Sequence, residues 1–299
     1  MAIEGQNIKF NNGVAMPLLG LGVFLSKPEE TAASVRTALI EGYRLIDTAA
    51  AYNNERQVGE GIRESRINRS EIFVTSKLWM TDYGNKSARK GFGVSLGKLG
   101  LDYIDLYLLH WPMPSDFKAT IAAYQELETL LEDGLVRAIG VSNFSPRHLE
   151  ALMAECKITP SVNQVELHPF LIQRELRAYH KQHRIVTEAW SPIGGVFVRN
   201  PKAAPKSAAS PLSHPLVLHL AEKYSKTPAQ IVLRWHIEHG IVAIPKSIQP
   251  TRIAENFGVF DFRLTADEVE SIDALDTGKR AGADPESVKA DTFPIKIEE

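Results

Sequence analysis

Ile104-Asp105-Leu106-Tyr107-Leu108-Leu109-His110 is an apolar run that ends in a histidine, and it decides the fold. Two similar runs precede it, Arg44-Leu45-Ile46-Asp47 and Ile72-Phe73-Val74-Thr75-Ser76-Lys77, which end in an aspartate and a lysine. Apolar runs of this length between helical patterns are typical of buried parallel strands. We therefore expect an ionisable side chain at the end of each of these three strands.

Further strand-like runs predict the architecture of the whole chain. Most follow one another at about 30 residues, the spacing of a βαβ unit. They lie near Leu21, Ile46, Val74, Tyr107, Ile139, Val165, Val186 and Val242. Eight such runs predict an α/β fold of the (β/α)8 TIM-barrel type, and we expect one domain over residues 1–299 because no linker-like stretch divides it.

The ends of several elements carry local signals. Residues 8–10 and 14–16 flank an Asn-Gly turn, which predicts an N-terminal β-hairpin that caps one end of the barrel. Ser26 with Glu29, and Thr227 with Gln230, fit the capping box that begins a helix. The proline-rich stretch 191–215 follows the seventh strand, and a loop of this length predicts a lid over the site.

Composition excludes several classes of partner. The 299 residues include 34 basic and 36 acidic side chains, for a net charge of −2. This balance gives no electrostatic reason to expect nucleic acid or a membrane as partner, so any phosphate site must be local. No apolar run reaches about 18 residues and no signal peptide is evident, so we expect a cytoplasmic protein, which we also expect to be a monomer. The single cysteine, Cys156, predicts neither a disulfide nor a metal site.

Four polar residues point to a reaction. Asp47, Lys77 and His110 end their strands, and Tyr52 follows the first of them by five residues. The carboxyl ends of barrel strands open onto one face, so we expect the four side chains to converge there. The lysine would lower the pKa of the phenol while the aspartate orients the lysine, and the histidine would aim a substrate carbonyl. This set predicts a proton donor for the reduction of a small-molecule carbonyl substrate.

Other interpretations of these residues remain open. Asp47 and Lys77 alone could form a structural ion pair, and His110 alone could be a core histidine. The protein could also bind a cofactor without catalysis, or use Lys77 for Schiff-base chemistry as a lyase. A turnover assay separates the first of these rivals from an enzyme, and borohydride trapping of a substrate adduct tests the second.

The chain resembles the aldo-keto reductase family over nearly its whole length. The matching stretches include Gly42-Tyr43-Arg44-Leu45-Ile46-Asp47-Thr48-Ala49 with Tyr52, and Ser76-Lys77-Leu78-Trp79, and they continue through residues 54–55, 58–59, 102–112, 139–144, 163–166 and 244–247. The stretch 189–195 and the C-terminal tail are similar to the prokaryotic branch, which includes 2,5-diketo-D-gluconic acid reductases. The resemblance implies NADPH-dependent reduction of aldehydes and activated ketones, with Tyr52 as the general acid.

The residues that would hold NADPH follow the later strands. Amide and hydroxyl groups on Ser142, Asn143 and Gln164 suit a nicotinamide carboxamide, and the face of Trp190 suits stacking on its ring. Lys246, Ser247 and Arg252 offer cations and amides for a 2′-phosphate. Family comparison adds Glu255 and Asn256 near the adenine. The predicted cofactor set is completed by Gly22, Val23, Ser191, Pro192, Ile193, Gly194 and Ile248.

The substrate would meet an aromatic wall. Phe24, Trp79 and Trp111 follow the first, third and fourth strands, and they favour compact carbonyls with an apolar or planar part. Two stretches depart from the family's pattern. Val23-Phe24 stands where many members have Thr-Trp or Thr-Tyr, and Asn53 stands where glycine is more common. A differently shaped substrate pocket is therefore expected.

Overall fold

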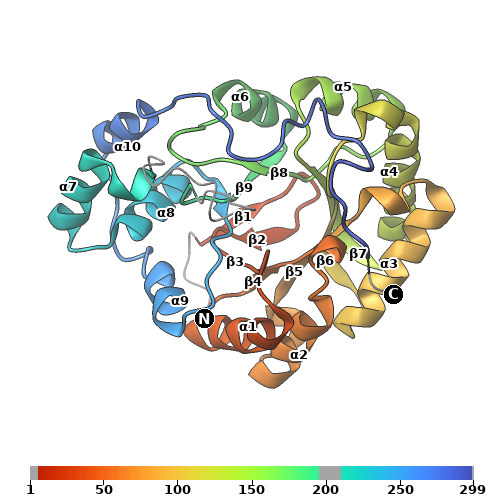
Figure 1. The fold of residues 1–299 in the computed structure, drawn as a ribbon, viewed down its shortest axis with the longest axis horizontal. Helices are drawn as coiled ribbons and strands as arrows, with labels where there is room; N and C mark the ends of the chain where they lie inside the picture. The colour runs from red at the N-terminus through yellow and green to blue at the C-terminus, as the bar shows by residue number, and fades with distance from the viewer. Residues whose placement is uncertain (1–5, 195–209, 298–299) are drawn as a thin grey trace.

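A computed structural model describes residues 6–194 and 210–297, and it shows a ring of helices around parallel strands (Figure 1). The strands are neighbours in chain order. They are β3 (Leu21–Gly22), β4 (Leu45–Asp47), β5 (Phe73–Leu78), β6 (Ile104–Leu109), β7 (Val136–Ser142), β8 (Val162–Glu166), β9 (Val186–Trp190) and β10 (Val242–Ala243). All eight predicted strands are present, which confirms the (β/α)8 barrel.

Backbone hydrogen bonds close the barrel between its first and last strands. Leu19 forms a parallel bridge with Ala243. The amide of Ala243 donates to Leu18 O at 3.0 Å, and that of Gly20 donates to Ala243 O at 2.9 Å. A closed sheet leaves no edge strand, so the strand interiors can be fully apolar.

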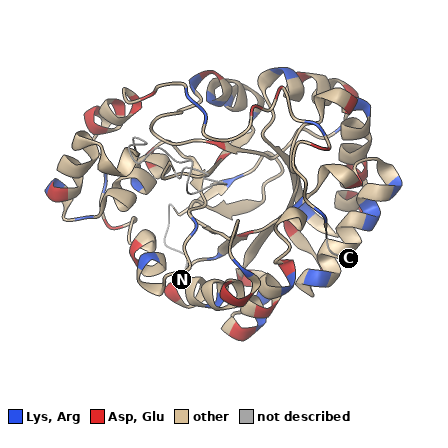
Figure 2. Ribbon diagram, viewed as in Figure 1, with Lys and Arg blue, Asp and Glu red and all other residues tan. Residues whose placement is uncertain are grey.

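Ten helices of the described chain surround the strands (Figure 1). They are α1 (Pro28–Glu41), α2 (Glu55–Ser65), α3 (Asn85–Leu99), α4 (Phe117–Glu132), α5 (Pro146–Glu155), α6 (Arg174–His183), α7 (Pro215–Tyr224), α8 (Pro228–Glu238), α9 (Pro250–Phe257) and α10 (Ala266–Asp273). Basic and acidic residues are interspersed along these helices (Figure 2). None of the described helices has the length and apolarity to cross a membrane.

The predicted hairpin is present as β1 (Asn7–Lys9) and β2 (Ala15–Pro17), paired antiparallel. Its turn is tied to the loops that lead into the strands. Asn12 Nδ2 donates to Arg137 O at 3.0 Å, and Asn11 Nδ2 donates to Pro160 O at 3.2 Å. Because these acceptors lie at the starts of β7 and β8, the hairpin covers the amino end of the barrel and leaves the carboxyl end open.

Helix capping follows one prediction and departs from the other. Thr227 and Gln230 form the expected capping box at the start of α8. Ser26 does not cap α1, because Pro28 fixes the first turn and makes Lys27 the residue before the helix. The predicted box at Ser26 is therefore wrong by one residue. The predicted lid 191–215 lies largely outside the described residues.

Candidate active site

Lys77 is the centre of a buried cluster at the carboxyl end of the barrel. Its side chain is fully buried. The ammonium donates to both carboxylate oxygens of Asp47, at 2.7 and 2.8 Å, and to Thr48 O at 2.9 Å. It also reaches Tyr52 Oη at 3.3 Å. The structure thus brings together three of the four residues that the sequence placed on one rim.

A short turn positions Tyr52 beside the lysine. Residues Ala50–Tyr52 form one 3₁₀ turn directly after β4. Asn53 then adopts a left-handed conformation with φ 53°, which reverses the chain into α2. The side chain of Asn54 fixes this turn. Its Oδ1 accepts from Thr48 Oγ1 at 3.0 Å, and its Nδ2 donates to Val23 O at 3.0 Å. These contacts connect the loop after β3 to the loop that carries the phenol.

Burial and Lys77 act in opposite directions on the pKa of Tyr52. Burial raises the pKa of the phenol to about 12, while the charge of Lys77 lowers it and that of Asp47 raises it. The lysine therefore acts in the predicted direction, and burial outweighs its effect, so the net shift is upward. Burial also lowers the pKa of Lys77, and the neighbouring Asp47 more than reverses this, so the net shift is upward. The site at neutral pH holds a protonated phenol next to an ammonium.

His110 completes the cluster from the end of β6. Its ring lies edge-on to Tyr52, with centroids 5.6 Å apart, and edge-on to Trp79 at 5.1 Å. Burial, with a further contribution from Lys77, holds the pKa of the imidazole well below its ordinary value. Nδ1 has no hydrogen-bond partner in the described part of the chain. The ring is therefore neutral and can donate a hydrogen bond to a ligand.

The residues predicted to hold the nicotinamide form a connected network beside the cluster. Gln164 Nε2 donates to Asp47 Oδ2 at 2.8 Å, and Ser142 Oγ donates to Gln164 O at 2.8 Å. Asn143 Nδ2 donates to His110 O at 3.0 Å, while its Oδ1 accepts from Trp190 Nε1 at 2.8 Å. These bonds orient the half-exposed indole of Trp190. Because the edge of the indole is held in place, its face is suited to stack against the planar ring of a cofactor.

The remaining predicted cofactor residues lie at the same end of the barrel. Gly22 ends β3 and Val23 follows it, and a Cβ on Gly22 would lie 3.0 Å from Ile244 O. Residues 191–194 follow β9 directly. Residues 246–248 lie between β10 and α9, and Arg252, Glu255 and Asn256 lie on α9. Lys246 and Arg252 are exposed, and neither makes an ion pair with any described residue. Two unpaired cations beside a helix start suit a phosphate group.

The predicted aromatic wall includes a residue that the sequence argument did not identify. Phe24 lies 4.9 Å from Tyr52, measured between ring centroids. Trp79 and Trp111 both contact Phe293, at 5.8 and 5.3 Å. Phe293 belongs to the C-terminal segment, which crosses the open end of the barrel (Figure 1). The tail therefore forms part of the aromatic wall beside His110.

Two polar residues hold this tail in place. The carboxylate of Glu166, at the end of β8, accepts from the amides of Ala281 and Gly282 at 2.7 and 3.0 Å. Asn53 Nδ2 donates to Lys296 O at 3.0 Å. In the sequence, Asn53 stands out only as a departure from the family's pattern. Its partner lies 243 residues away, so no local signal could reveal the contact.

Glu188 is the second feature that the sequence argument missed. It lies in β9 opposite Gln164 and is fully buried. Neither carboxylate oxygen has a hydrogen-bond partner in the described chain. Burial and the charge of Asp47 raise the pKa of Glu188 to about 8, against weaker opposing effects of Gln164 and Lys77. The sequence did carry one signal for Glu188, which is a charged residue inside the strand-like run 186–190.

Fold and site together define a (β/α)8-barrel oxidoreductase. The sequence agrees with this class, because a model described as "Aldo/keto reductase family" matches residues 19–277. The chain belongs to the aldo/keto reductase family.

Curated relatives and solved structures extend over almost the whole chain. Morphine 6-dehydrogenase of Pseudomonas putida is 50% identical over 293 residues, which cover 98% of this chain and 99% of the relative. Methylglyoxal reductase DkgA of Escherichia coli is 48% identical over 281 residues, which cover 93% and 96%. An aldo-keto reductase of Bombyx mori, solved in complex with NADP, is 36% identical with a TM-score of 0.85, covering 94% of this chain and 96% of that one.

Proposed function

We propose that this protein reduces aldehydes and activated ketones, such as α-keto and diketo compounds, to alcohols, with NADPH as cofactor and Tyr52 as the general acid. The observation that carries the assignment of Tyr52 is the Lys77 ammonium, which contacts Asp47 on one side and Tyr52 Oη at 3.3 Å on the other. When bound, NADPH supplies the hydride. The protein's own residues then have to deliver one proton to the carbonyl oxygen.

The donors around the carbonyl oxygen are fixed before reaction. As negative charge grows on that oxygen, the Tyr52 hydroxyl donates its proton, and the neighbouring ammonium stabilises the phenolate that remains. A neutral His110 donates a hydrogen bond that orients the carbonyl without competing for the proton. Asp47 keeps the ammonium charged and directed towards Tyr52. Loss of one positioned acid typically costs about 10²–10⁴-fold in rate.

The residues around Trp190 and α9 fit a dinucleotide phosphate. Ser142, Asn143 and Gln164 lie beside the fixed indole and would hold the carboxamide. The unpaired cations Lys246 and Arg252 would bind the 2′-phosphate, since a guanidinium can form paired hydrogen bonds with phosphate. The solved Bombyx mori relative binds NADP. Both ends of the cofactor thus have candidate partners on one face of the barrel.

The rival Schiff-base chemistry finds no support in the geometry. Lys77 is fully buried, and its ammonium is engaged by a carboxylate, a backbone carbonyl and a phenol. A nucleophilic amine needs a free lone pair and access to the substrate. Borohydride in the presence of a carbonyl substrate is therefore expected to leave no adduct on the protein.

The aromatic residues around the catalytic cluster, rather than the cluster itself, would determine which carbonyls are reduced. Relatives with about half of their residues identical are named for methylglyoxal and for morphine, which are very different molecules. Here Phe24, Trp79, Trp111 and Phe293 offer apolar and stacking contact. We therefore favour compact carbonyls with an apolar or planar part over polar sugar acids.

The experiment is a measurement of NADPH oxidation with a panel of carbonyls. Phenylglyoxal and benzaldehydes should give higher kcat/KM than a diketo-sugar acid. A clear advantage for the sugar acid would overturn the proposed substrate class but not the reaction. No oxidation with any aldehyde, ketone or diketone would instead favour a cofactor-binding protein without catalysis.

We also propose that the active species is a monomer. The candidate catalytic, cofactor-binding and wall residues all come from one chain. Light scattering behind size-exclusion chromatography, run at assay concentration, should give a mass near 33.2 kDa.

A further inference from the structure

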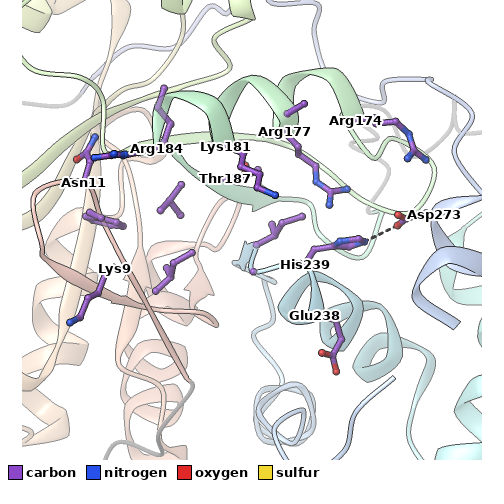
Figure 3. A pocket seen from close by; sticks show the side chains of 17 residues that line it. Lys9, Asn11, Arg174, Arg177, Lys181, Arg184, Thr187, Glu238, His239 and Asp273 are labelled. Carbon is purple, nitrogen blue, oxygen red and sulfur yellow. Dashed lines mark hydrogen bonds and ion pairs between the residues drawn. The ribbon is translucent and has the colours of Figure 1, made fainter. Parts of the chain in front are cut away.

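A separate cavity lies between the N-terminal hairpin, α6 and the end of α8 (Figure 3). Its volume is about 710 Å³. Its walls come from the N-terminal hairpin, α6, the turn after α8 and the start of β9. β9 begins at Val186 in this cavity and ends at Trp190 beside the catalytic cluster. The two sites therefore lie at opposite ends of the barrel.

Among the charged residues that line this cavity, positive side chains outnumber negative ones. Arg174, Arg177, Lys181 and Arg184 follow one another at intervals of three or four residues along α6 and its C-cap. Such intervals place side chains on one face of a helix. Lys9 of β1 adds a fifth cation. A chain with a net charge of −2 thus concentrates five positive charges around one cavity.

The two acids of the lining are already engaged. Glu238 Oε1 accepts from Arg234 Nε at 2.7 Å. Asp273 Oδ1 accepts from Trp235 Nε1 at 2.8 Å and lies 2.8 Å from His239 Nε2 (Figure 3). Within residues 6–194 and 210–297, none of the five cations makes an ion pair with a carboxylate. The five cations of the lining therefore outnumber its two acids, and none of the five forms an ion pair within the described protein.

Helix stability does not account for these charges. Lys181 and Arg184 lie at the C-terminal end of α6, where the helix dipole favours cations. Arg174 is the first residue of that helix, where the dipole favours acids instead. Arg177 is half-buried, and the one hydrogen bond of its side chain to a described residue is a long contact to Ile172 O at 3.5 Å. Burial lowers the pKa of Arg177 despite the opposing charge of Asp273. A partly buried guanidinium with no carboxylate in hydrogen-bond contact is unfavourable unless a ligand supplies such a partner.

We propose that this cavity binds an organic molecule with two or more phosphate groups. Guanidinium groups match phosphate oxygens with paired hydrogen bonds, and three of the five cations are arginines. At 1.5 Å per residue, the cations on α6 extend over about 15 Å, which is more than one phosphate can contact. Ile8, Phe10 and Ile185 line the cavity as well and offer an apolar surface for the organic part.

The test is calorimetric titration of inorganic tripolyphosphate into the full-length enzyme saturated with NADP⁺, which blocks the phosphate site near Arg252. We expect one binding site per chain. The double variant Arg177→Gln/Lys181→Gln should bind at least about tenfold more weakly, because two charge-assisted contacts are lost. The control Arg56→Gln/Lys118→Gln removes the same charge from exposed positions outside the cavity and should bind like the wild type.

Further titrations define the ligand class. Orthophosphate should bind at least about tenfold more weakly than tripolyphosphate, because it reaches fewer of the cations. Absence of tripolyphosphate binding, or equal weakening in both double variants, would overturn the proposal. Tighter binding of citrate than of tripolyphosphate would overturn the assignment to phosphate. If the first double variant unfolds, the exposed single substitution Lys181→Gln against Lys118→Gln gives the same comparison.

Discussion

Lys77 at the carboxyl end of the barrel and the cavity cations at the amino end differ in how their positive charge is compensated. At the carboxyl end, Lys77 is fully buried and is matched by both oxygens of Asp47 within 2.8 Å. At the amino end, Arg177 and Lys181 line a cavity and make no ion pair within the described chain. A buried charge must be compensated by the fold itself, whereas an accessible charge can be compensated by a ligand. Substitution of the buried Lys77 should therefore damage chemistry and stability together, and substitutions of the cavity cations should damage binding alone.

The largest effect is expected from Lys77→Met. Turnover should fall about 10²–10⁴-fold, because an unassisted phenol is a weak acid. The free energy of unfolding should also fall by about 3–5 kcal/mol, since Asp47 is left buried without its partner. The double variant Lys77→Met/Asp47→Asn should regain much of that stability but none of the turnover, as followed by denaturant unfolding and NADPH oxidation. Recovery of turnover in the double variant would show that the lysine is only structural.

Arg252→Ala tests an exposed cation at the carboxyl end. NADPH binding should weaken about ten- to a hundredfold, because charge-assisted bonds to the 2′-phosphate are lost. NADH lacks this phosphate and should bind nearly as before. Fluorescence titration with both cofactors measures the difference. Equal weakening of the two would mean that Arg252 does not contact the phosphate.

Glu188→Gln tests a buried group beside the matched pair. The pKa of Glu188 is raised from 4.5 to about 8, so the folded protein holds a proton that the unfolded chain releases. The stability that this contributes is complete below about pH 4.5 and is lost as the pH rises towards 8. The variant should show a smaller decline of Tm across this range than the wild type. Glu132→Gln, at an exposed position, is the control and should keep the wild-type slope.

Asn53→Gly should give the smallest effect. Glycine tolerates the left-handed backbone of residue 53, so the change removes the hydrogen bond to Lys296 O without strain. Loss of one neutral hydrogen bond implies about a two- to tenfold rise in KM for carbonyls that contact Phe293. Amide hydrogen exchange of residues 290–297 should become faster. An unchanged exchange rate would show that Asn53 does not hold the tail.

The sequence predicts the barrel because its strands are uniform apolar runs. Each run also ends at the carboxyl end of the barrel, so the sequence alone could place Asp47, Lys77 and His110 together. Closure of the sheet and a hairpin cap at one end of the barrel follow from the same pattern. These features depend on local patterning and on the rules of parallel sheets.

What the sequence could not predict depends on contacts between distant residues. The sign of the Tyr52 pKa shift is set by burial, which composition does not reveal. Phe293 reaches Trp79 and Trp111 across most of the chain length, and Asn53 reaches Lys296 in the same way. Four of the five cations of the amino-end cavity lie on α6 and its C-cap, whose sequence resembles an ordinary charged surface helix. Pattern analysis describes single elements, and these features arise where elements meet.

The most direct test of the proposed chemistry is Tyr52→Phe, with turnover and NADPH affinity measured on the same preparation. The ring still packs against Phe24 and His110, while the proton donor is removed. We expect nearly unchanged NADPH affinity and a loss of turnover of about 10²–10⁴-fold. Retention of more than roughly a tenth of wild-type turnover with normal cofactor binding would contradict the assignment of Tyr52 as the acid.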